Sequence, residues 1–325
     1  MKKEPLVSVI IPNYNHALFL KKRIESVLNQ TFQDFEIILL DDCSTDNSLE
    51  ILHQYKNHPK VKHFEINKIN SGSVFKQWVK GINLANSKYT WIAESDDVAH
   101  PKFLEKMLNF ADQKNDLGLV FCKSIQIDKS GAITSLLSDK YDCFGNQELK
   151  DQRRIIKFIL KESLIKNASS VLFNNKSFNY VNFEKLSTLK NIGDKFVYVM
   201  IGLNKNIYMC NDSLNYCRIH GNNSTTNDIK SKKIYVDRLF MIDYLLPIIN
   251  DQDAKKILLS YYTSQFFATL DSNFYQFNSA IVKRLRGDNY IHNIKFLILR
   301  LIIFSHKILK NKFPFTIRKF LKNNL

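Results

Sequence analysis

Cysteine is scarce in this sequence, and its spacing excludes two kinds of site. The five cysteines stand at positions 43, 122, 143, 210 and 217, so no two form a CxxC pair and the number is odd. This pattern argues against a zinc site or a disulfide framework and fits a reducing compartment. A hydrophobic content of 45% and a charged content of 24% are ordinary for a globular protein.

Long uncharged hydrophobic runs are also lacking. The most apolar segment, 294–309, is interrupted by Lys295, Arg300 and Lys307. Its uncharged stretches fall short of the roughly 18 to 20 residues that a membrane-spanning helix needs. The amino terminus leads directly into a strand pattern, without the length or cleavage site of a signal peptide, so we expect a cytoplasmic protein.

Acidic residues are missing from the end of the chain. Residues 289–325 contain no Asp or Glu but eight Lys and Arg, half of the formal net charge of +16. A basic, apolar helix can lie in a membrane interface, which would place the protein on the inner face of the cytoplasmic membrane. It can equally pack on a core with a solvated basic face, and both interpretations stay open.

The hydrophobic pattern predicts alternating strands and helices over the first 127 residues. Strands are predicted at 7–11, 36–40, 61–66, 89–93 and 117–127, with a helix after each of the first four. This order is typical of βαβ units and a mostly parallel, Rossmann-like sheet with flanking helices. Further on, we predict helices at 153–161, 182–190 and 194–203 and strands at 169–174, 207–209 and 214–219. From 232 onward the pattern is helical, so we divide the chain into a domain at 1–227 and a helical, basic region at 228–325.

Two acidic clusters follow two of the predicted strands. Asp41 and Asp42 come after the second strand, and Glu94, Asp96 and Asp97 come after the fourth. Ligands of open α/β sheets bind at the carboxyl ends of the strands, so the clusters can form one crevice. Such closely spaced acids suit a hard divalent cation bound to a diphosphate. Each cluster taken alone could also be a turn that caps the following helix.

Three segments together resemble the inverting family-2 glycosyltransferases with the GT-A fold. These segments are Pro12-Asn13-Tyr14-Asn15, Asp41-Asp42-x-Ser44-Thr45-Asp46 and Glu94-x-Asp96-Asp97, and their order and spacing match across about the first 125 residues. The resemblance implies a nucleotide-sugar donor, most simply a UDP-sugar, and a Mn²⁺ or Mg²⁺ cofactor. It also implies a set of nucleotide-binding residues: Pro12, Tyr14, Asn15, Asp41, Asp42, Ser95 and Asp96. The DxD motif of the family corresponds to Glu94-Ser95-Asp96, so Glu94 and Asp96 become metal candidates.

Weaker resemblances in the second half imply the remaining catalytic groups. Asp194 stands where these enzymes place the base that deprotonates the acceptor hydroxyl, and Glu184 is the second candidate. Asp194 could also be an N-terminal capping residue. Arg218-Ile219-His220 is similar to the Arg-x-His loop of the family, so Arg218 and His220 are expected at the diphosphate and His220 also at the metal. A lone histidine is more often structural.

Together these expectations describe an inverting enzyme that transfers a sugar to a hydroxyl of a glycan or lipid-linked acceptor. One rival is a sugar-nucleotide pyrophosphorylase, which would need a glycine-rich loop after the first strand, whereas this chain has Pro12 to His16 there. Another is a non-enzymatic membrane- or nucleic-acid-binding protein. The concentration of positive charge in a terminal apolar segment argues against nucleic acid. The oligomeric state is left open.

Overall fold

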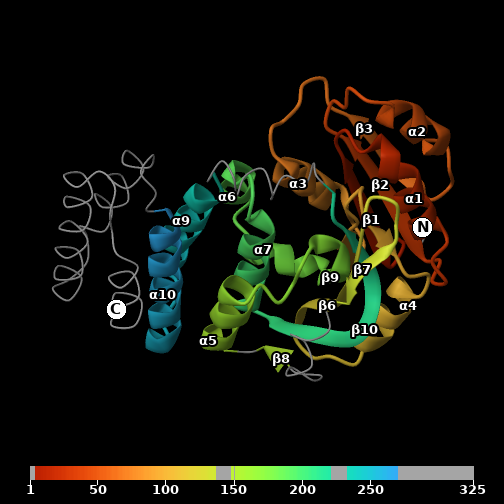
Figure 1. Ribbon diagram of the computed structural model, residues 1–325. Coiled ribbons are helices and arrows are strands. Elements are labelled where there is room, and N and C mark those ends of the chain that lie inside the picture. Colours follow the sequence, from red (N-terminus) through yellow and green to blue (C-terminus); the bar gives the residue numbers. More distant parts are fainter. Residues whose placement is uncertain (1–3, 137–147, 150, 221–232, 270–325) are drawn as a thin grey trace, which may run out of the picture. The chain divides into compact units, whose positions relative to one another are not determined.

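The computed structural model describes residues 4–136, 148–149, 151–220 and 233–269 (Figure 1). The chain divides into two compact units, Met1–Tyr261 and Tyr262–Leu325, and the fold described below is that of the first. The basic segment 289–325, for which membrane contact was predicted, lies outside the described residues. The domain boundary predicted at 227 stays a prediction.

Helices and strands alternate through the first half of the chain, as the hydrophobic pattern predicted. The strands are β1 (Val7–Asn13), β2 (Phe35–Asp41), β3 (Val61–Ile66), β4 (Tyr89–Ile92), β5 (Val98–Ala99), β6 (Leu117–Ile127), β7 (Ile133–Leu136), β8 (Glu148–Leu149), β9 (Val171–Asn174) and β10 (Asn206–Arg218). The helices are α1 (Ala17–Leu28), α2 (Ser48–Tyr55), α3 (Val74–Leu84), α4 (Phe103–Ala111), α5 (Gln152–Ile155), α6 (Phe183–Thr188), α7 (Gly193–Gly202), α9 (Lys233–Leu245) and α10 (Gln252–Thr269). Short π or 3₁₀ segments are η1 (Ile156–Lys161), η2 (Ala168–Ser170) and η3 (Asn175–Tyr180).

Among the described residues, the strands form one sheet in the order β3-β2-β1-β4-β9-β6-β10-β5, with β7 on β6 and β8 on β10. The first four strands in this order are parallel, and β6 pairs in parallel with β10. Strand β9 lies antiparallel between β4 and β6 and thus joins the two parallel groups. This α/β arrangement with a largely parallel central sheet confirms the predicted fold class.

Helices cover both faces of the sheet. Val9 and Ile11 of β1 belong to a core with α1 and α4, and the side chains between them point to the other face. There α3 packs so closely on β1 that a Cβ on Gly81 would clash with Ile10. Helices α6 and α7 lie beside α3 (Figure 1). The carboxyl-edge loops therefore rest on a packed two-sided core.

The prediction of two separate strands between residues 207 and 219 was wrong. The two short strands predicted at 207–209 and 214–219 are a single strand, β10, with register shifts against β6 between Cys210 and Asn215. The polar residues Asn211, Asp212 and Ser213 suggested a turn. They are exposed in the bulge, where no packing on the sheet demands apolar side chains.

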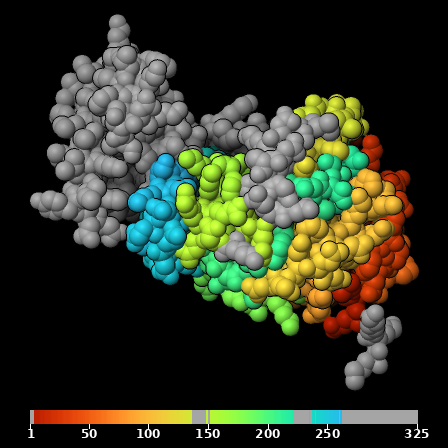
Figure 2. Space-filling view, turned by 90° about the horizontal axis from the view of Figure 1, so that it is seen from below, coloured from red at the N-terminus to blue at the C-terminus, as the bar shows by residue number. Residues whose placement is uncertain are grey.

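Helix α9 and the part of α10 up to Tyr261 belong to the first unit. Phe196 of α7 packs edge-on against Tyr244 of α9, with ring centroids 5.3 Å apart. The backbone amides of Asn250 and Asp251 donate to the Oε1 atom of Gln152, which holds the start of α10 against α5. In Figure 2, the blue atoms of α10 lie beside the yellow-green atoms of the segment that contains α5. Among the helices that the structure describes, none has the length and apolar character needed to cross a membrane.

Candidate active site

Three strand ends meet at one edge of the sheet. Because β1 pairs in parallel with both β2 and β4, the segments after Asn13, Asp41 and Ile92 emerge together. All three segments predicted to bind the nucleotide or the metal are therefore neighbours.

Hydrogen bonds connect the segment after β1 to the segment after β2. The buried carboxylate of Asp41 accepts hydrogen bonds from the Nδ2 of Asn13 at 2.8 Å and from the backbone amide and hydroxyl of Ser44 at 2.8 and 2.6 Å. Asn15 has a left-handed backbone with φ of 54°. Its Oδ1 accepts from the amide of Thr45 at 2.7 Å. Asp41 and Asn15 thus shape the crevice, and their predicted contact with nucleotide stays a prediction.

Asp42 faces a different loop. Its carboxylate accepts from the side chains of Asn67, Ser71 and Gln77 at 2.7 to 2.9 Å and from the amide of Ser71 at 2.9 Å. These bonds connect β2 to the start of α3. Pro12 is buried within β1, whereas 45% of Tyr14 is exposed, so Tyr14 presents an aromatic surface beside Asp42's strand.

Histidines lie on either side of Asp96. The Nε2 of His220 is 3.1 Å from the Oδ2 of Asp96, and one ring nitrogen of His16 completes a group whose ligand atoms all lie within 4.8 Å of one another. One carboxylate and two imidazoles are a donor set that suits a borderline divalent cation. The predicted metal residues Asp96 and His220 are thus brought together, and His16 was not predicted. Glu94 is outside this group among the described residues, and its metal role stays a prediction.

The ionisation of these groups is compatible with cation binding. Burial lowers the pKa of His16, although Asp96 opposes the shift. Burial alone would raise the pKa of Asp96, but the hydrogen bond from His220 and the nearby His16 hold it below its ordinary value. A neutral imidazole and an ionised carboxylate are the forms that bind metals.

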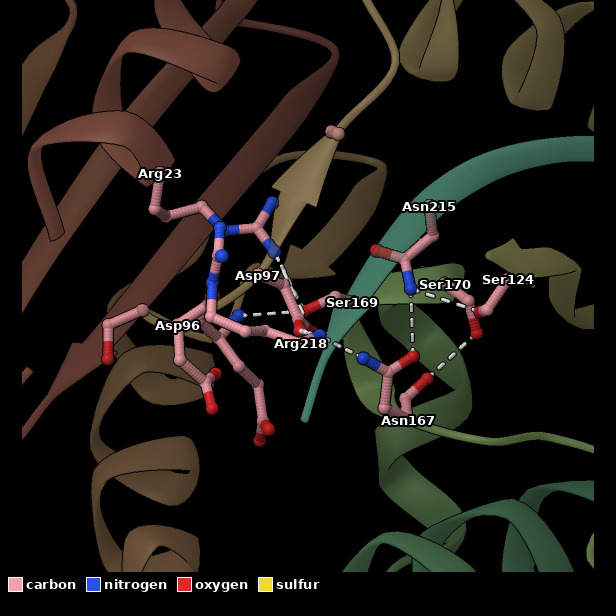
Figure 3. A network of polar contacts seen from close by, with 12 residues as sticks. Arg23, Asp96, Asp97, Ser124, Asn167, Ser169, Ser170, Asn215 and Arg218 are labelled. Atoms are coloured by element: carbon pink, nitrogen blue, oxygen red, sulfur yellow. Dashed lines mark hydrogen bonds and ion pairs between the residues drawn. The ribbon is translucent and has the colours of Figure 1, made fainter. Parts of the chain in front are cut away.

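A buried network supports the acidic segment from below (Figure 3). Asp97, which is 2% exposed, accepts from the amide of Arg218 at 2.8 Å and from the Nδ2 of Asn167, and it lies 3.8 Å from the guanidinium of Arg23. Burial raises the pKa of Asp97 to about 7, with Asp96 adding to the shift and Arg23 opposing it. Behind it, Asn215 donates to Asn167 and to Ser124, both at 3.0 Å.

The two arginines hold backbone carbonyls of the acidic segment. Arg23, with no exposed surface, donates to the carbonyl of Glu94 at 2.8 Å and to the hydroxyl of Ser169 at 3.0 Å. Arg218 donates to the carbonyls of Asp96 and Asp128 at 2.8 and 2.7 Å. Its diphosphate role stays a prediction, since these contacts occupy its Nε and Nη1. Ser169 is fully buried in this network.

Asp194 is presented by the start of α7, which packs against α3. It lies in the first turn of α7, directly after Gly193, where a Cβ would come within 2.7 Å of the Phe75 ring of α3. Glycine therefore lets α7 begin close to α3. Burial raises the pKa of Asp194, although Lys195 opposes the shift. Asp194 also contributes, after burial, Asp96 and Asp97, to a pKa of Glu94 well above its ordinary value.

The roles of His16 and Arg23 in the site were not predicted from the sequence, although the sequence contains a feature that indicates each of them. Arg23 shares the buried face of α1 with Phe19, Leu20 and Ile24, and an arginine on an apolar stripe implies a buried partner. His16 directly follows the polar segment that ends at Asn15, at the strand edge where ligands bind.

Comparisons with known proteins identify the family. Residues 8–178 match the family model described as "Glycosyl transferase family 2". The chain therefore belongs to glycosyl transferase family 2, which favours the glycosyltransferase interpretation over both rivals.

Several relatives support this membership. The chain is 26% identical over 277 residues to the poly(ribitol-phosphate) β-N-acetylglucosaminyltransferase TarP of Staphylococcus aureus, a match that covers 82% of this chain and 79% of that protein. It is 34% identical over 171 residues to an uncharacterized glycosyltransferase of Methanocaldococcus jannaschii, covering 52% of this chain and 56% of the relative. A chondroitin synthase of Escherichia coli is 34% identical over 143 residues, which are 44% of this chain but only 20% of that protein.

Solved structures share the fold. S. aureus TarS in complex with UDP-GlcNAc gives a TM-score of 0.62 at 18% identity, covering 90% of this chain and 79% of that one. The mannosyltransferase PcManGT of Pyrobaculum calidifontis, in complex with GDP-Man and Mn²⁺, gives 0.55 at 12% identity, covering 96% and 89%. At these identities the likeness establishes the GT-A fold.

Proposed function

We propose that this chain is an inverting glycosyltransferase that transfers a sugar from a UDP-sugar to a hydroxyl of a glycan or lipid-linked acceptor. The observation that carries the proposal is the meeting, at one sheet edge, of the polar segments after β1, β2 and β4 with the group of His16, Asp96 and His220. UDP is favoured because TarS, of similar fold, binds UDP and UDP-GlcNAc.

The groups that line the crevice would have separate roles. Asp42 and Tyr14 offer an acceptor group and an aromatic face to the uridine. The Asp96 group would hold a divalent cation, which would supply positive charge to the diphosphate as it leaves. The PcManGT complex with Mn²⁺ is in keeping with this cofactor.

The acceptor hydroxyl would give its proton to Asp194. A base must face the anomeric carbon from the side opposite the leaving diphosphate for in-line displacement with inversion. Asp194 lies in the first turn of α7, whereas Asp96 follows β4. The raised pKa of Asp194 makes it a stronger base than an ordinary aspartate.

The acceptor and the location are proposed more broadly. By their names, TarP is a poly(ribitol-phosphate) β-N-acetylglucosaminyltransferase and the chondroitin synthases make chondroitin, so a polymer is the acceptor class to try first. The basic end of the sequence would bring the enzyme to the inner face of the cytoplasmic membrane, where lipid-linked acceptors lie.

Calorimetric titration of UDP, with and without Mn²⁺, tests the proposal. We expect Mn²⁺-dependent binding to the wild type and to Asp112→Ala, a control at the amino end of β4, where Asp112 accepts from the hydroxyl of Tyr89. Asp96→Ala should bind UDP at least about tenfold more weakly. If the wild type binds neither UDP nor GDP nor dTDP, the proposed function is wrong.

A further inference from the structure

We propose that His16 is a protein ligand of the metal, and that the two imidazoles make this site select a transition-metal dication such as Mn²⁺ over Mg²⁺. The inference deepens the proposed function and rests on it only for the identity of the diphosphate ligand. It concerns which residues of this chain bind the ion and which ion they prefer.

The three side chains form a compact group from three distant parts of the chain. His16 follows β1, Asp96 follows β4 and His220 follows β10, yet one ligand atom of each lies within 4.8 Å of the others. The two imidazole rings are nearly perpendicular, at 89°, with centroids 5.6 Å apart. Ligand atoms bound about 2.1 Å from one ion lie roughly 3 Å apart, so small side-chain movements would close the group.

Ser95 orients the His16 ring. The Nδ1 of His16 lies 2.8 Å from the hydroxyl of Ser95, which is 3% exposed. Histidines that bind metals usually engage their second ring nitrogen in such a hydrogen bond, which fixes the tautomer and the ring direction. With Nδ1 protonated and donating to the Ser95 hydroxyl, Nε2 keeps the lone pair that binds an ion. Ser95, the middle residue of Glu94-Ser95-Asp96, thus positions a metal ligand, a role that its place between two acids did not indicate.

The backbone around His16 is fixed for reasons independent of the imidazole. The amide of Asn15 donates to the hydroxyl of Ser44 at 2.9 Å, and the amide of Ala17 donates to the carboxylate of Asp46 at 2.9 Å. His16 itself is the N-cap residue of α1, but its side chain makes no capping bond. A side chain that does no capping there is available for a ligand, and its replacement leaves the helix start intact.

Phe19 gives the group an apolar wall. Its ring lies 4.9 Å from that of His220 and 6.2 Å from that of His16. An apolar wall excludes water from one side of the group, which strengthens the binding of a cation by the remaining ligands.

The chemistry of the donor set predicts the choice of ion. Mg²⁺ prefers carboxylate, phosphate and water oxygens and is usually bound through one or two carboxylates. Imidazole nitrogen favours the transition metals, whose affinity for such sites rises from Mn²⁺ to Cu²⁺ and is lower again for Zn²⁺. One carboxylate with two imidazoles therefore favours Mn²⁺ and the ions after it, whereas Asp96 with carboxylate and water partners would tolerate Mg²⁺.

The experiment counts imidazoles on Mn²⁺ bound to the full chain by pulsed electron paramagnetic resonance, without any sugar donor. Affinities for Mn²⁺ and, by competition, Mg²⁺ are measured on the same samples, with and without UDP. The variants are His16→Gln, Ser95→Ala and the control His53→Gln, whose imidazole is exposed on α2. Circular dichroism melting verifies that each variant is folded.

We expect two imidazoles in the wild type and in His53→Gln, and one in His16→Gln. His16→Gln should lose about tenfold or more in Mn²⁺ affinity with a smaller loss for Mg²⁺, and Ser95→Ala should keep two imidazoles but bind about tenfold more weakly. One imidazole or no Mn²⁺ binding in the wild type, or an unchanged preference between the two ions in His16→Gln, would overturn the inference. Two imidazoles without nucleotide binding would support the inference while contradicting the proposed function.

Discussion

At the scale of single residues, the site contains buried carboxyl groups with different environments. Asp96 lies beside two histidines, and its pKa is held below its ordinary value. For Asp194, burial raises the pKa and the nearby Lys195 opposes the shift. Groups whose pKa values are pushed apart in this way suit opposite roles, one as a charged ligand and the other as a base.

Asp194→Asn tests the assignment of the base. Because Asn cannot accept a proton, we expect kcat to fall by about 10² to 10⁴ while the KM for the donor changes little. In the wild type, the base must be ionised, so activity falls as the pH falls through its pKa. Because burial raises that pKa above the ordinary 3.8, the acidic limb of the kcat/KM profile should lie above pH 3.8 and should vanish in the variant.

Glu184→Gln is the matched control, since Glu184 was the second candidate for the base and is exposed on α6. It should keep wild-type kcat and the same profile. A large loss in Glu184→Gln together with normal activity in Asp194→Asn would transfer the role of base to Glu184.

At the scale of elements, α1 and the acidic turn after β4 are joined through one buried arginine. Arg23→Met should lower the free energy of unfolding by about 3 to 5 kcal/mol, because it leaves Asp97 buried without its nearest cationic side chain. Urea denaturation followed by fluorescence measures this change.

Lys21→Met, on the same helix, is the control for the loss of a positive charge. Lys21 is 61% exposed and lies 3.9 Å from Glu25. Such surface pairs contribute about 0 to 1 kcal/mol, so this variant should unfold almost as the wild type does. Equal effects of the two substitutions would show that the Arg23 network does not stabilise the fold.

The elements also show what the sequence could and could not predict. The strands up to 127 and the acidic edge follow from hydrophobic periodicity and from polar segments at strand ends, which are local signals. The direction of β9 and the bulge in β10 depend on pairing with β4 and β6, which periodicity does not encode. The role of Arg23 depends on Ser169, which is 146 positions away. Such partners cannot be paired from one sequence, although a lone charge on an apolar helix face indicates that one exists.

At the scale of the whole molecule, the charge distribution predicts membrane association. The full chain should sediment with vesicles containing anionic phospholipid and not with neutral ones, because each basic residue near an anionic surface contributes about 1 kcal/mol. Replacing Lys295, Arg300 and Lys307 by Gln should weaken sedimentation, and 0.5 M salt should abolish most of it. Equal binding to both kinds of vesicle would contradict an electrostatic role for these residues.

The insertion of β9 between β4 and β6 has a consequence for synthesis on the ribosome. The three segments that carry the main resemblance lie within the first 125 residues, but two groups that hold the acidic one, Ser169 before β9 and Arg218 at the end of β10, emerge much later. Contacts so far apart in sequence form slowly, because long loops must close first. The nascent chain therefore carries the acidic segment for roughly 100 residues before these contacts can order it, and an amino-terminal fragment that ends after the three segments would be an incomplete folding unit.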